Sequence, residues 1–322
     1  IQKGMLPPEL PHHLMEAVLT YAYRASKIAS YYPHDLIHVH DWLCIPAGIA
    51  ASNVSGKPLI SHIHSTEFDR SGGLSVNPAV YSLEKQGVGR SDNLIAVSKF
   101  TANLLLEHYS ANPAKLNVVH NGVNPEEFTL PLSSDPFEII KQNGFKVVIF
   151  VGRITIQKGP DYFIRAAQKV LGYCPKTVFV FAGSGDMEGQ IVELASRLGI
   201  SHRVLFAGFL RGQVLKDAFK SADIFVMPSV SEPFGLVALE SIASGTPAII
   251  SKQSGVSETL TNVLKVDFWD VDEMTDQMVA ILKNPALYRT LKSEGLNESK
   301  KRTWSKAAAE TIKVYRKTLS KK

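Results

Sequence analysis

The sequence predicts an α/β fold made of two Rossmann-like, doubly wound domains, each a parallel sheet with helices on both faces. Short apolar runs rich in β-branched residues alternate with longer helical patterns along most of the chain. The apolar runs lack polar alternation, as expected of strands that are covered on both faces of a sheet. The length of 322 residues suits two domains of ordinary size. No repeat of fixed period is present, which excludes solenoids and propellers.

The apolar runs are the expected strands. In the first half of the chain they are 35–40, 58–63, 93–97 and 116–119, and in the second half 146–151, 177–182, 204–207, 224–227, 248–251 and 264–267. Helical patterns fill the gaps, as at 162–171, 187–198 and 213–221. After residue 267 the pattern is helical only, and it ends in an amphipathic segment at 305–319.

The boundary between the domains is expected where this alternation stops. Residues 125–144 contain several prolines and no clean period, so they are interpreted as a linker. We therefore predict an N-terminal domain at residues 1–135, a second domain at 136–300 and a terminal helical segment at 301–322.

Composition excludes several classes of protein. With 45% hydrophobic and 20% charged residues, the chain is globular rather than disordered. No apolar run reaches the roughly 18 residues that a membrane-spanning helix needs. The two cysteines, Cys44 and Cys174, are typical of a reducing compartment, so a cytoplasmic location is predicted. The chain starts at Ile1 with no signal-like segment.

Positive charge is concentrated at the end of the chain. Residues 300–322 hold nine Lys or Arg against a single acid, Glu310, while the whole chain has a formal net charge of +5. A nucleic-acid binder would spread its basic surface over a folded face, so nucleic acid is not an expected partner. A solvated basic helix is the favoured interpretation, and weak peripheral contact with an anionic membrane surface is the alternative.

Two cations follow the predicted strand at 146–151. Arg153 and Lys158 lie on one strand-to-helix turn, and Pro160 suits the first turn of the helix that follows. A fixed guanidinium fork and a mobile ammonium group suit a diphosphate ligand. An ordinary solvated loop is the alternative. Taken alone, this turn is better explained as a solvated loop. Ligands of open α/β sheets bind at the carboxyl ends of strands, so the residues after each strand are considered together.

Small residues follow the predicted strand at 177–182. Gly183 and Gly185 would let the backbone approach a ligand closely, with a helix N-terminus behind them. The segment is not a GxGxxG fingerprint, and tight α/β turns use glycine equally often for steric reasons.

Two glutamates follow the strand at 224–227. Glu232 is expected in a loop and Glu240 inside the next helix, whose first-turn amides at Gly235, Leu236 and Val237 face a potential anion. Carboxylates suit sugar hydroxyls, and cations and backbone amides suit phosphates. Together they fit a ligand in which a sugar is attached through a diphosphate. Taken singly, each glutamate is equally well explained as a surface acid or a complement to the helix dipole.

These segments together resemble the GT-B retaining glycosyltransferases of family 4, the glycosyl transferases group 1. The resemblance rests on Gly152-Arg153 with Lys158-Gly159 and on the run from Glu232 to Glu240, and it extends from about Asp35 to the C-terminus. The segments His40-Asp41-Trp42-Leu43 and 64–69 are most similar to the glycogen and starch synthase branch.

The resemblance implies a GT-B architecture with a cleft between the two domains and a terminal helix, 301–322, that crosses back onto the first. Domain 1–135 would face the acceptor, and domain 136–300 would bind the donor. The implied catalytic residues are His64, Arg153, Lys158 and Glu232. The implied donor-binding residues are Gly152, Arg153, Lys158, Gly183, Gly185, Phe234, Gly235, Leu236, Val237 and Glu240.

The resemblance also assigns roles within this set. Arg153 and Lys158 would neutralise the donor diphosphate, Glu232 would contact the transferred sugar, and Glu240 would bind the ribose. His64 would lie near the anomeric centre. The donor would be a nucleoside-diphosphate hexose of the glucose or mannose type, and the acceptor a sugar or glucan hydroxyl. Neither a cofactor nor a metal is expected.

One departure from the family concerns the start of the chain. The family begins with a strand and a glycine-rich loop, whereas residues 1–34 contain a proline-rich entry and a single helix at 10–31. The first sheet is therefore expected to be incomplete. A sugar-nucleotide-binding module without turnover, or a relative such as an epimerase or a phosphorylase, stays an alternative.

A second alternative is a metal-dependent hydrolase. The pairs His38/His40 and His62/His64 each place two imidazoles on one face of a strand, and Asp41 could add a carboxylate. This alternative is disfavoured because it leaves the paired glutamates and the phosphate loops unexplained.

Overall fold

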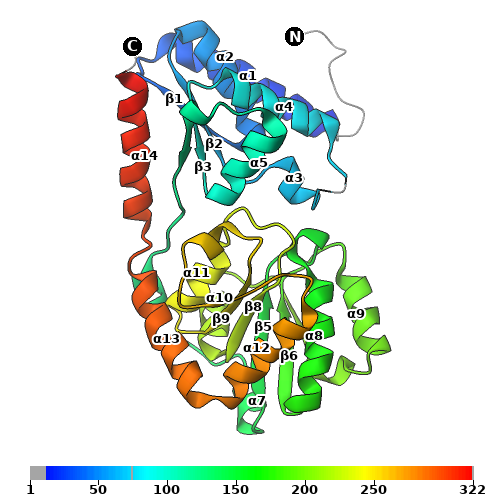
Figure 1. The fold of residues 1–322 in the computed structure, drawn as a ribbon. Coiled ribbons are helices and arrows are strands. Elements are labelled where there is room, and N and C mark those ends of the chain that lie inside the picture. The colour runs from blue at the N-terminus through cyan, green and yellow to red at the C-terminus, as the bar shows by residue number, and fades with distance from the viewer. Residues whose placement is uncertain (1–11, 74, 321–322) are drawn as a thin grey trace. The chain divides into compact units, whose positions relative to one another are not determined.

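The computed structural model describes residues 12–73 and 75–320. The described chain divides into two compact units (Figure 1): the first contains the described residues up to His120 and from Ser305 onward, and the second contains Asn121–Trp304. Each unit is built on one parallel sheet, so the predicted fold class is confirmed. None of the described helices combines the length and apolar character needed to cross a membrane.

The first unit has a four-stranded sheet in the order β1-β2-β3-β4. Its strands are β1 (Ile37–His40), β2 (Leu59–Ile63), β3 (Asn93–Ala96) and β4 (Leu116–Val118). Its helices are α1 (His12–Tyr31), α2 (Asp41–Ser55), α3 (Glu67–Arg70), α4 (Pro78–Arg90), α5 (Lys99–Tyr109), the short η1 (Pro113–Lys115) and α14 (Trp304–Leu319), whose first residue lies in the second unit. Between residues 12 and 36 the structure describes a helix and no strand, and residues 10 and 11 of the predicted helix lie outside the described part.

Alternate residues of this sheet face opposite layers. Val39 and Leu59 pack with Ile45 of α2 in one apolar cluster. On the other face Ile60 packs with Val314 of α14, which returns from the far end of the sequence. His38 and His40, on either side of Val39, belong to this second face because side chains alternate along a strand.

The second unit has a six-stranded sheet in the order β10-β9-β8-β5-β6-β7. Its strands are β5 (Lys146–Val151), β6 (Thr177–Ala182), β7 (Val204–Gly208), β8 (Ile224–Met227), β9 (Ala248–Ser251) and β10 (Leu264–Val266). The chain builds outward from β5 in one direction through β6 and β7, and then in the other through β8 to β10. The order therefore reverses between β5 and β8, which is where doubly wound sheets bind their ligands.

Helices cover both faces of this sheet. They are α6 (Pro125–Thr129), α7 (Glu138–Gln142), α8 (Pro160–Tyr173), α9 (Glu188–Arg197), α10 (Gly212–Ser221), α11 (Leu236–Ala243), α12 (Val271–Lys283) and α13 (Pro285–Ser299), with 3₁₀ turns η2 (Ile156–Lys158), η3 (Ser201–Arg203) and η4 (Gly255–Glu258). Val226 of β8 packs in the main cluster with Phe163 of α8. The preceding Phe225 contacts Phe219 of α10 at 5.5 Å between ring centroids, and it faces the opposite layer because side chains alternate along a strand.

The expected linker at 125–144 is wrong in one respect, because it contains the helices α6 and α7. Each helix has only five residues, too few to show a period in the sequence. Each has a buried aromatic residue in it or next to it, Phe128 and Phe137, which are 7% and 5% exposed. Both helices lie in the second unit.

Candidate active site

The loops that follow β5 and β8 meet at the point where the strand order reverses. The two strands pair directly, with Ile149 beside Phe225. Gln157 of η2 then ties the loops together: its carbonyl accepts from the amide of Val230 at 2.9 Å, and its side-chain amide donates to the carbonyl of Ser231 at 3.1 Å. Gln157 is 3% exposed. Sequence reasoning missed it because an uncharged residue between two cations carries no signal of its own.

This joint brings Lys158 and Glu232 together. The Lys158 Nζ lies 2.5 Å from the Glu232 Oε2, and the buried Ser229 hydroxyl donates to the same oxygen at 3.2 Å. Glu232 is only 7% exposed, so the carboxylate depends on these partners. A cation and a carboxylate of the predicted set are therefore in contact, from two different loops.

Arg153 is positioned through the same joint. Its guanidinium donates to the Gln157 side-chain oxygen at 2.9 Å and remains exposed to solvent. Gly159 ends η2 with φ of 63° and packs its Cα against the Pro228 carbonyl, where no side chain would fit. The turn thus holds Arg153 and Lys158 on the edge where β5 and β8 end.

The two glycines after β6 have a packing role. Gly152 and Gly183 have φ of 154° and 151°, and a Cβ on Gly183 would lie 1.9 Å from the Gly152 carbonyl oxygen. A Cβ on Gly185 would lie 2.3 Å from the Ile154 carbonyl oxygen. Glycine is therefore required at 183 and 185 because one loop approaches the next so closely. Contact of Gly152, Gly183 or Gly185 with a ligand stays a prediction.

The loop after β9 clamps the segment that carries Glu232. The Glu232 amide donates to the Gln253 carbonyl at 3.0 Å, and the Gly255 amide donates to the Glu232 carbonyl at 2.9 Å. The carbonyl of the buried Phe234 accepts from the Val256 amide at 2.6 Å. The backbone of Glu232 is therefore fixed from both sides by residues that the sequence did not single out.

Helix α11 begins directly after this clamp. Gly235 is its N-cap, with φ of 108°. Leu236 and Val237 are the first two residues of the helix, and the next amide, that of Ala238, donates to the Gly235 carbonyl at 3.0 Å. These first-turn amides lie at the positive end of the helix. Their placement after Glu232 is the one expected from the sequence.

Glu240 lies on α11 beside a cavity of about 190 Å³ in the second unit. Burial raises the pKa of Glu240, and the charge of Lys216 opposes this rise. Lys216 also lines the cavity and pairs with Glu127 at 2.8 Å between Nζ and Oε2. Sequence reasoning missed Lys216 and Glu127 because they lie far from Glu240 in the chain, and Glu127 falls in the supposed linker.

His64 lies in the first unit, after β2. Its amide donates to the Asp41 Oδ1 at 2.7 Å, and its Nε2 shares a 2.8 Å hydrogen bond with the His40 Nδ1. Burial lowers the pKa of His64, although the Asp41 charge opposes that shift. Asp41 itself has a left-handed φ of 55°, a rare conformation that this bond to the end of β2 helps to hold.

A partly buried ion pair anchors the chain just beyond His64. Arg70 donates to the Ser65 carbonyl at 3.0 Å and pairs with Glu84 at 2.5 Å. The Tyr109 hydroxyl donates to the other oxygen of Glu84 at 2.5 Å. The segment that carries His64 is therefore fixed to α4 and α5.

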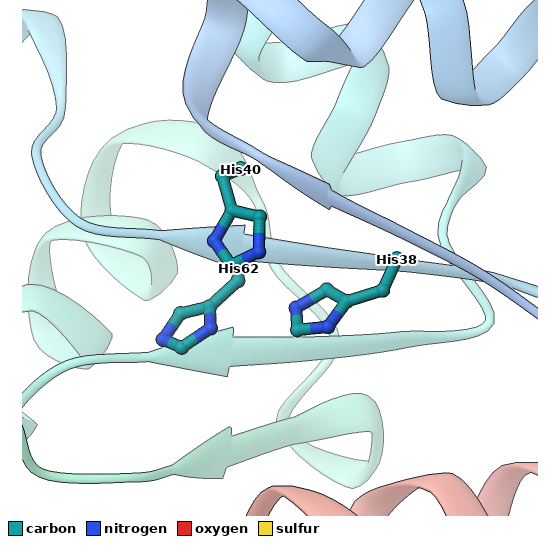
Figure 2. Close-up of side chains that lie close together, drawn as sticks. All are labelled: His38, His40 and His62. Atoms are coloured by element: carbon teal, nitrogen blue, oxygen red, sulfur yellow. The ribbon is translucent and has the colours of Figure 1, made fainter. Parts of the chain in front are cut away.

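The histidines of the hydrolase alternative also come together. Figure 2 shows His38, His40 and His62 side by side on one face of the sheet, and one ring nitrogen of each lies within 4.8 Å of the others. Burial and the neighbouring imidazoles lower the pKa of His38 to about 4 and of His62 to about 2. Asp41 does not join them, because its carboxylate accepts from the backbone amides of His64 and Ser65.

Comparisons with known proteins match both units. A family model described as Glycosyl transferases group 1 matches residues 133–298, and one described as Glycosyltransferase Family 4 matches residues 3–127. An uncharacterised glycosyltransferase of Methanocaldococcus jannaschii is 35% identical over 88% of this chain and 75% of its own length. A D-inositol 3-phosphate glycosyltransferase of Kribbella flavida is 31% identical over 98% of this chain and 78% of its own length.

Solved structures share the fold. The sucrose-phosphate synthase of Thermosynechococcus elongatus has a TM-score of 0.83 at 23% identity, covering 99% of this chain and 83% of its own. Anabaena HepE, solved with UDP and glucose, has a TM-score of 0.79 at 19% identity, covering 93% and 81%. These likenesses confirm the predicted GT-B fold. Because a family model spans most of the second unit and the archaeal relative matches most of the chain, this protein belongs to the glycosyl transferases group 1 family.

Proposed function

We propose that the protein is a retaining glycosyltransferase that moves a hexose from a nucleoside-diphosphate sugar to a sugar hydroxyl. The observation that carries this proposal is the contact of Lys158 with Glu232 at the junction of β5 and β8, with Arg153 on the same turn. Family membership supports glycosyl transfer. Anabaena HepE, a fold relative solved with UDP-glucose, supports a nucleotide sugar as the donor.

In the proposed complex, Lys158 exchanges its partner. Without ligand it neutralises Glu232. A donor diphosphate would take over the ammonium group and the exposed Arg153 guanidinium, which releases Glu232 to accept hydrogen bonds from the hexose. The Leu236 and Val237 amides would add fixed dipoles, and Glu240 would accept from the ribose.

Transfer would break the bond between the anomeric carbon and the diphosphate oxygen. The acceptor oxygen forms the new bond to that carbon on the same face, and its proton passes to the departing diphosphate. The diphosphate gains negative charge as it leaves, so preorganised cations and amides lower the barrier. Their preorganisation depends on Gln157 and on the clamp at Gln253–Gly255. His64 is assigned to the neighbourhood of the anomeric centre by the resemblance alone.

The first test is a thermal-shift titration with UDP, ADP, GDP and their glucose and mannose conjugates. A ligand that binds only the folded state raises the unfolding midpoint with concentration. We expect one base to do so, with the shift lost in Lys158→Ala. Lys176→Ala is the matched control, because Lys176 is an exposed lysine of the same unit and precedes β6 at its amino end. A shift that survives Lys158→Ala would remove the assigned donor site.

The second test follows transfer with the donor thus identified. Acceptors of different class are offered, such as inositol 3-phosphate, glucose 6-phosphate and a glucan, and NMR of the product reports the anomeric configuration. We expect retention, and a turnover in Lys158→Ala that is lower by about 10²–10³. Binding without transfer to any acceptor would favour the module without turnover, and an inverted product would exclude the retaining reaction.

A further inference from the structure

Four histidines form a ladder on one face of the first unit's sheet. His38 and His40 belong to β1, His62 lies beside His40 on β2, and His64 follows β2. Adjacent rings lie close: the His38 and His62 centroids are 5.4 Å apart in a stacked arrangement, and those of His62 and His64 are 4.3 Å apart. The proposed transfer chemistry uses His64 alone, which leaves three imidazoles without a function.

The spacing of these three suits a metal ion. One ring nitrogen from each of His38, His40 and His62 lies within 4.8 Å of the others, and Figure 2 shows the rings grouped where β1 and β2 run side by side. Zinc binds imidazole nitrogen at about 2.0–2.1 Å, so two nitrogens of a tetrahedral site lie about 3.4 Å apart. Small rotations of the rings would bring nitrogens that lie up to 4.8 Å apart to the separation that zinc requires.

His62 supplies an independent observation. This residue is only 7% exposed, and neither nitrogen of its ring has a hydrogen-bond partner among the described residues. The buried Nε2 of His38 also lacks a partner in the described part of the chain. Buried polar atoms are almost always satisfied in proteins, so these nitrogens point to a missing ligand.

Two of the three imidazoles, His38 and His40, make a hydrogen bond through Nδ1. The Nδ1 of His38 bonds to the Tyr315 hydroxyl at 2.5 Å, and the Nδ1 of His40 bonds to the His64 Nε2 at 2.8 Å. A ligating histidine normally uses its second nitrogen in this way, which fixes the ring orientation. The other nitrogen of each ring is left for a metal.

We propose that His38, His40 and His62 bind one divalent transition-metal ion of the zinc type, with a fourth position open to water. Neutral imidazoles are borderline ligands that suit zinc, copper or nickel better than magnesium or calcium. The site differs from the hydrolase alternative, since Asp41 is engaged elsewhere and the paired glutamates keep their own role. It lies wholly in the first unit and does not depend on the proposed transferase activity.

The test measures metal binding directly on the full chain. The protein is stripped with a chelator and titrated with Zn²⁺ by equilibrium dialysis with metal analysis. One equivalent should bind, the unfolding midpoint should rise with Zn²⁺ concentration, and Co²⁺ should give the visible bands of a four-coordinate site. His202→Gln is the matched control, because His202 is an exposed histidine of the second unit.

Two variants decide whether this cluster is the site. His62→Gln should weaken Zn²⁺ binding by more than about 100-fold, since even loss of an outer partner costs 10–100-fold. Tyr315→Phe keeps all three imidazoles and should weaken Zn²⁺ binding about 10-fold. This milder variant keeps the proposal testable if His62→Gln fails to fold. Binding only at millimolar Zn²⁺, or equal binding by wild type and both variants, would overturn the proposal.

Discussion

Glu232 is a buried carboxylate that is held by polar groups of the second unit. Lys158 and Ser229 bind one of its oxygens, and Gln253 and Gly255 hold its backbone. The side chain is thus free to change partner while the backbone stays fixed. That combination suits a group that recognises a ligand, because the geometry is prepared before binding.

Glu232→Gln should separate recognition of the sugar from recognition of the nucleotide. Free nucleoside diphosphate should bind at least as well as in wild type, since Lys158 loses its anionic partner. The gain in affinity from the attached hexose should fall by about 1.5–3 kcal/mol, the value of a hydrogen bond to a charged group. Calorimetric titration with the diphosphate and its sugar conjugate measures both.

The control for this variant is Glu193→Gln on α9, whose side chain is 70% exposed. It should leave both affinities unchanged. If Glu232→Gln weakens the free diphosphate and its conjugate equally, Glu232 does not contact the sugar.

A substitution at Gly183 tests whether the loop after β6 requires glycine for its packing against the loop after β5. Gly183→Ala would place a methyl group 1.9 Å from the Gly152 carbonyl oxygen at φ of 151°. Strain alone should cost about 1–3 kcal/mol of unfolding free energy, and displacement of Gly152 should weaken nucleotide binding through Arg153. Urea unfolding and thermal-shift titration report the two effects.

Gly172→Ala is the matched control in the same unit. Gly172 lies in α8 with open space around its missing side chain. Replacing glycine by alanine inside a helix should stabilise the protein by up to about 1 kcal/mol. Equal behaviour of the two variants would refute the packing argument.

At the scale of elements, the sequence was most informative where strands are buried on both faces. The bounds of β5, β6, β8 and β9 were all predicted, because each is an unbroken apolar run closed by polar or small residues. The short α6 and α7 were missed, since five residues are too few to show a helical period. The same limit applies to the site: Lys158 and Glu232 were found as motif residues, whereas Gln157 is visible only once two loops are in contact.

A carboxylate of α13 binds the loop that precedes β10. The buried Glu298 accepts hydrogen bonds from the backbone amides of Thr261 and Asn262 at 3.0 and 2.9 Å. Burial would raise the pKa of Glu298, but the amide hydrogen bonds outweigh it and hold the pKa below its ordinary 4.5. The charged form is therefore part of the folded structure.

Glu298→Gln should lower the free energy of unfolding at neutral pH by about 1–3 kcal/mol. A carboxyl group with a depressed pKa stabilises the fold above its ordinary pKa, and this contribution is lost as the pH falls through the depressed value. The difference between wild type and variant should thus shrink below pH 4.5. Urea unfolding at several pH values measures it.

Glu294→Gln provides the comparison, because Glu294 is an exposed residue of the same helix. It should change stability little at any pH. A deficit in Glu298→Gln that is the same at neutral and acidic pH would show that the charge is not what stabilises this contact.

At the scale of the whole molecule, the first unit is discontinuous in sequence. The chain leaves it at His120 and re-enters it at Ser305. Asn93 donates to the Thr318 hydroxyl at 2.9 Å, and Lys317 donates to the Asn117 side chain at 3.0 Å. This face of the sheet therefore depends on a helix that lies about 200 residues away from it in the sequence. Contacts of such long sequence separation slow folding.

Val314→Asp should show how far the first unit depends on this helix. Val314 is 5% exposed and packs with Ile60 and Ile95, so an aspartate would bury an unpaired charge and cost at least about 3 kcal/mol. Ile312→Asp, on the same helix at 45% exposure, should cost little. In Val314→Asp, proteolysis should cleave the first unit early while the nucleotide-dependent shift of the second unit persists. Equal effects of the two variants would mean that α14 does not complete the core of the first unit.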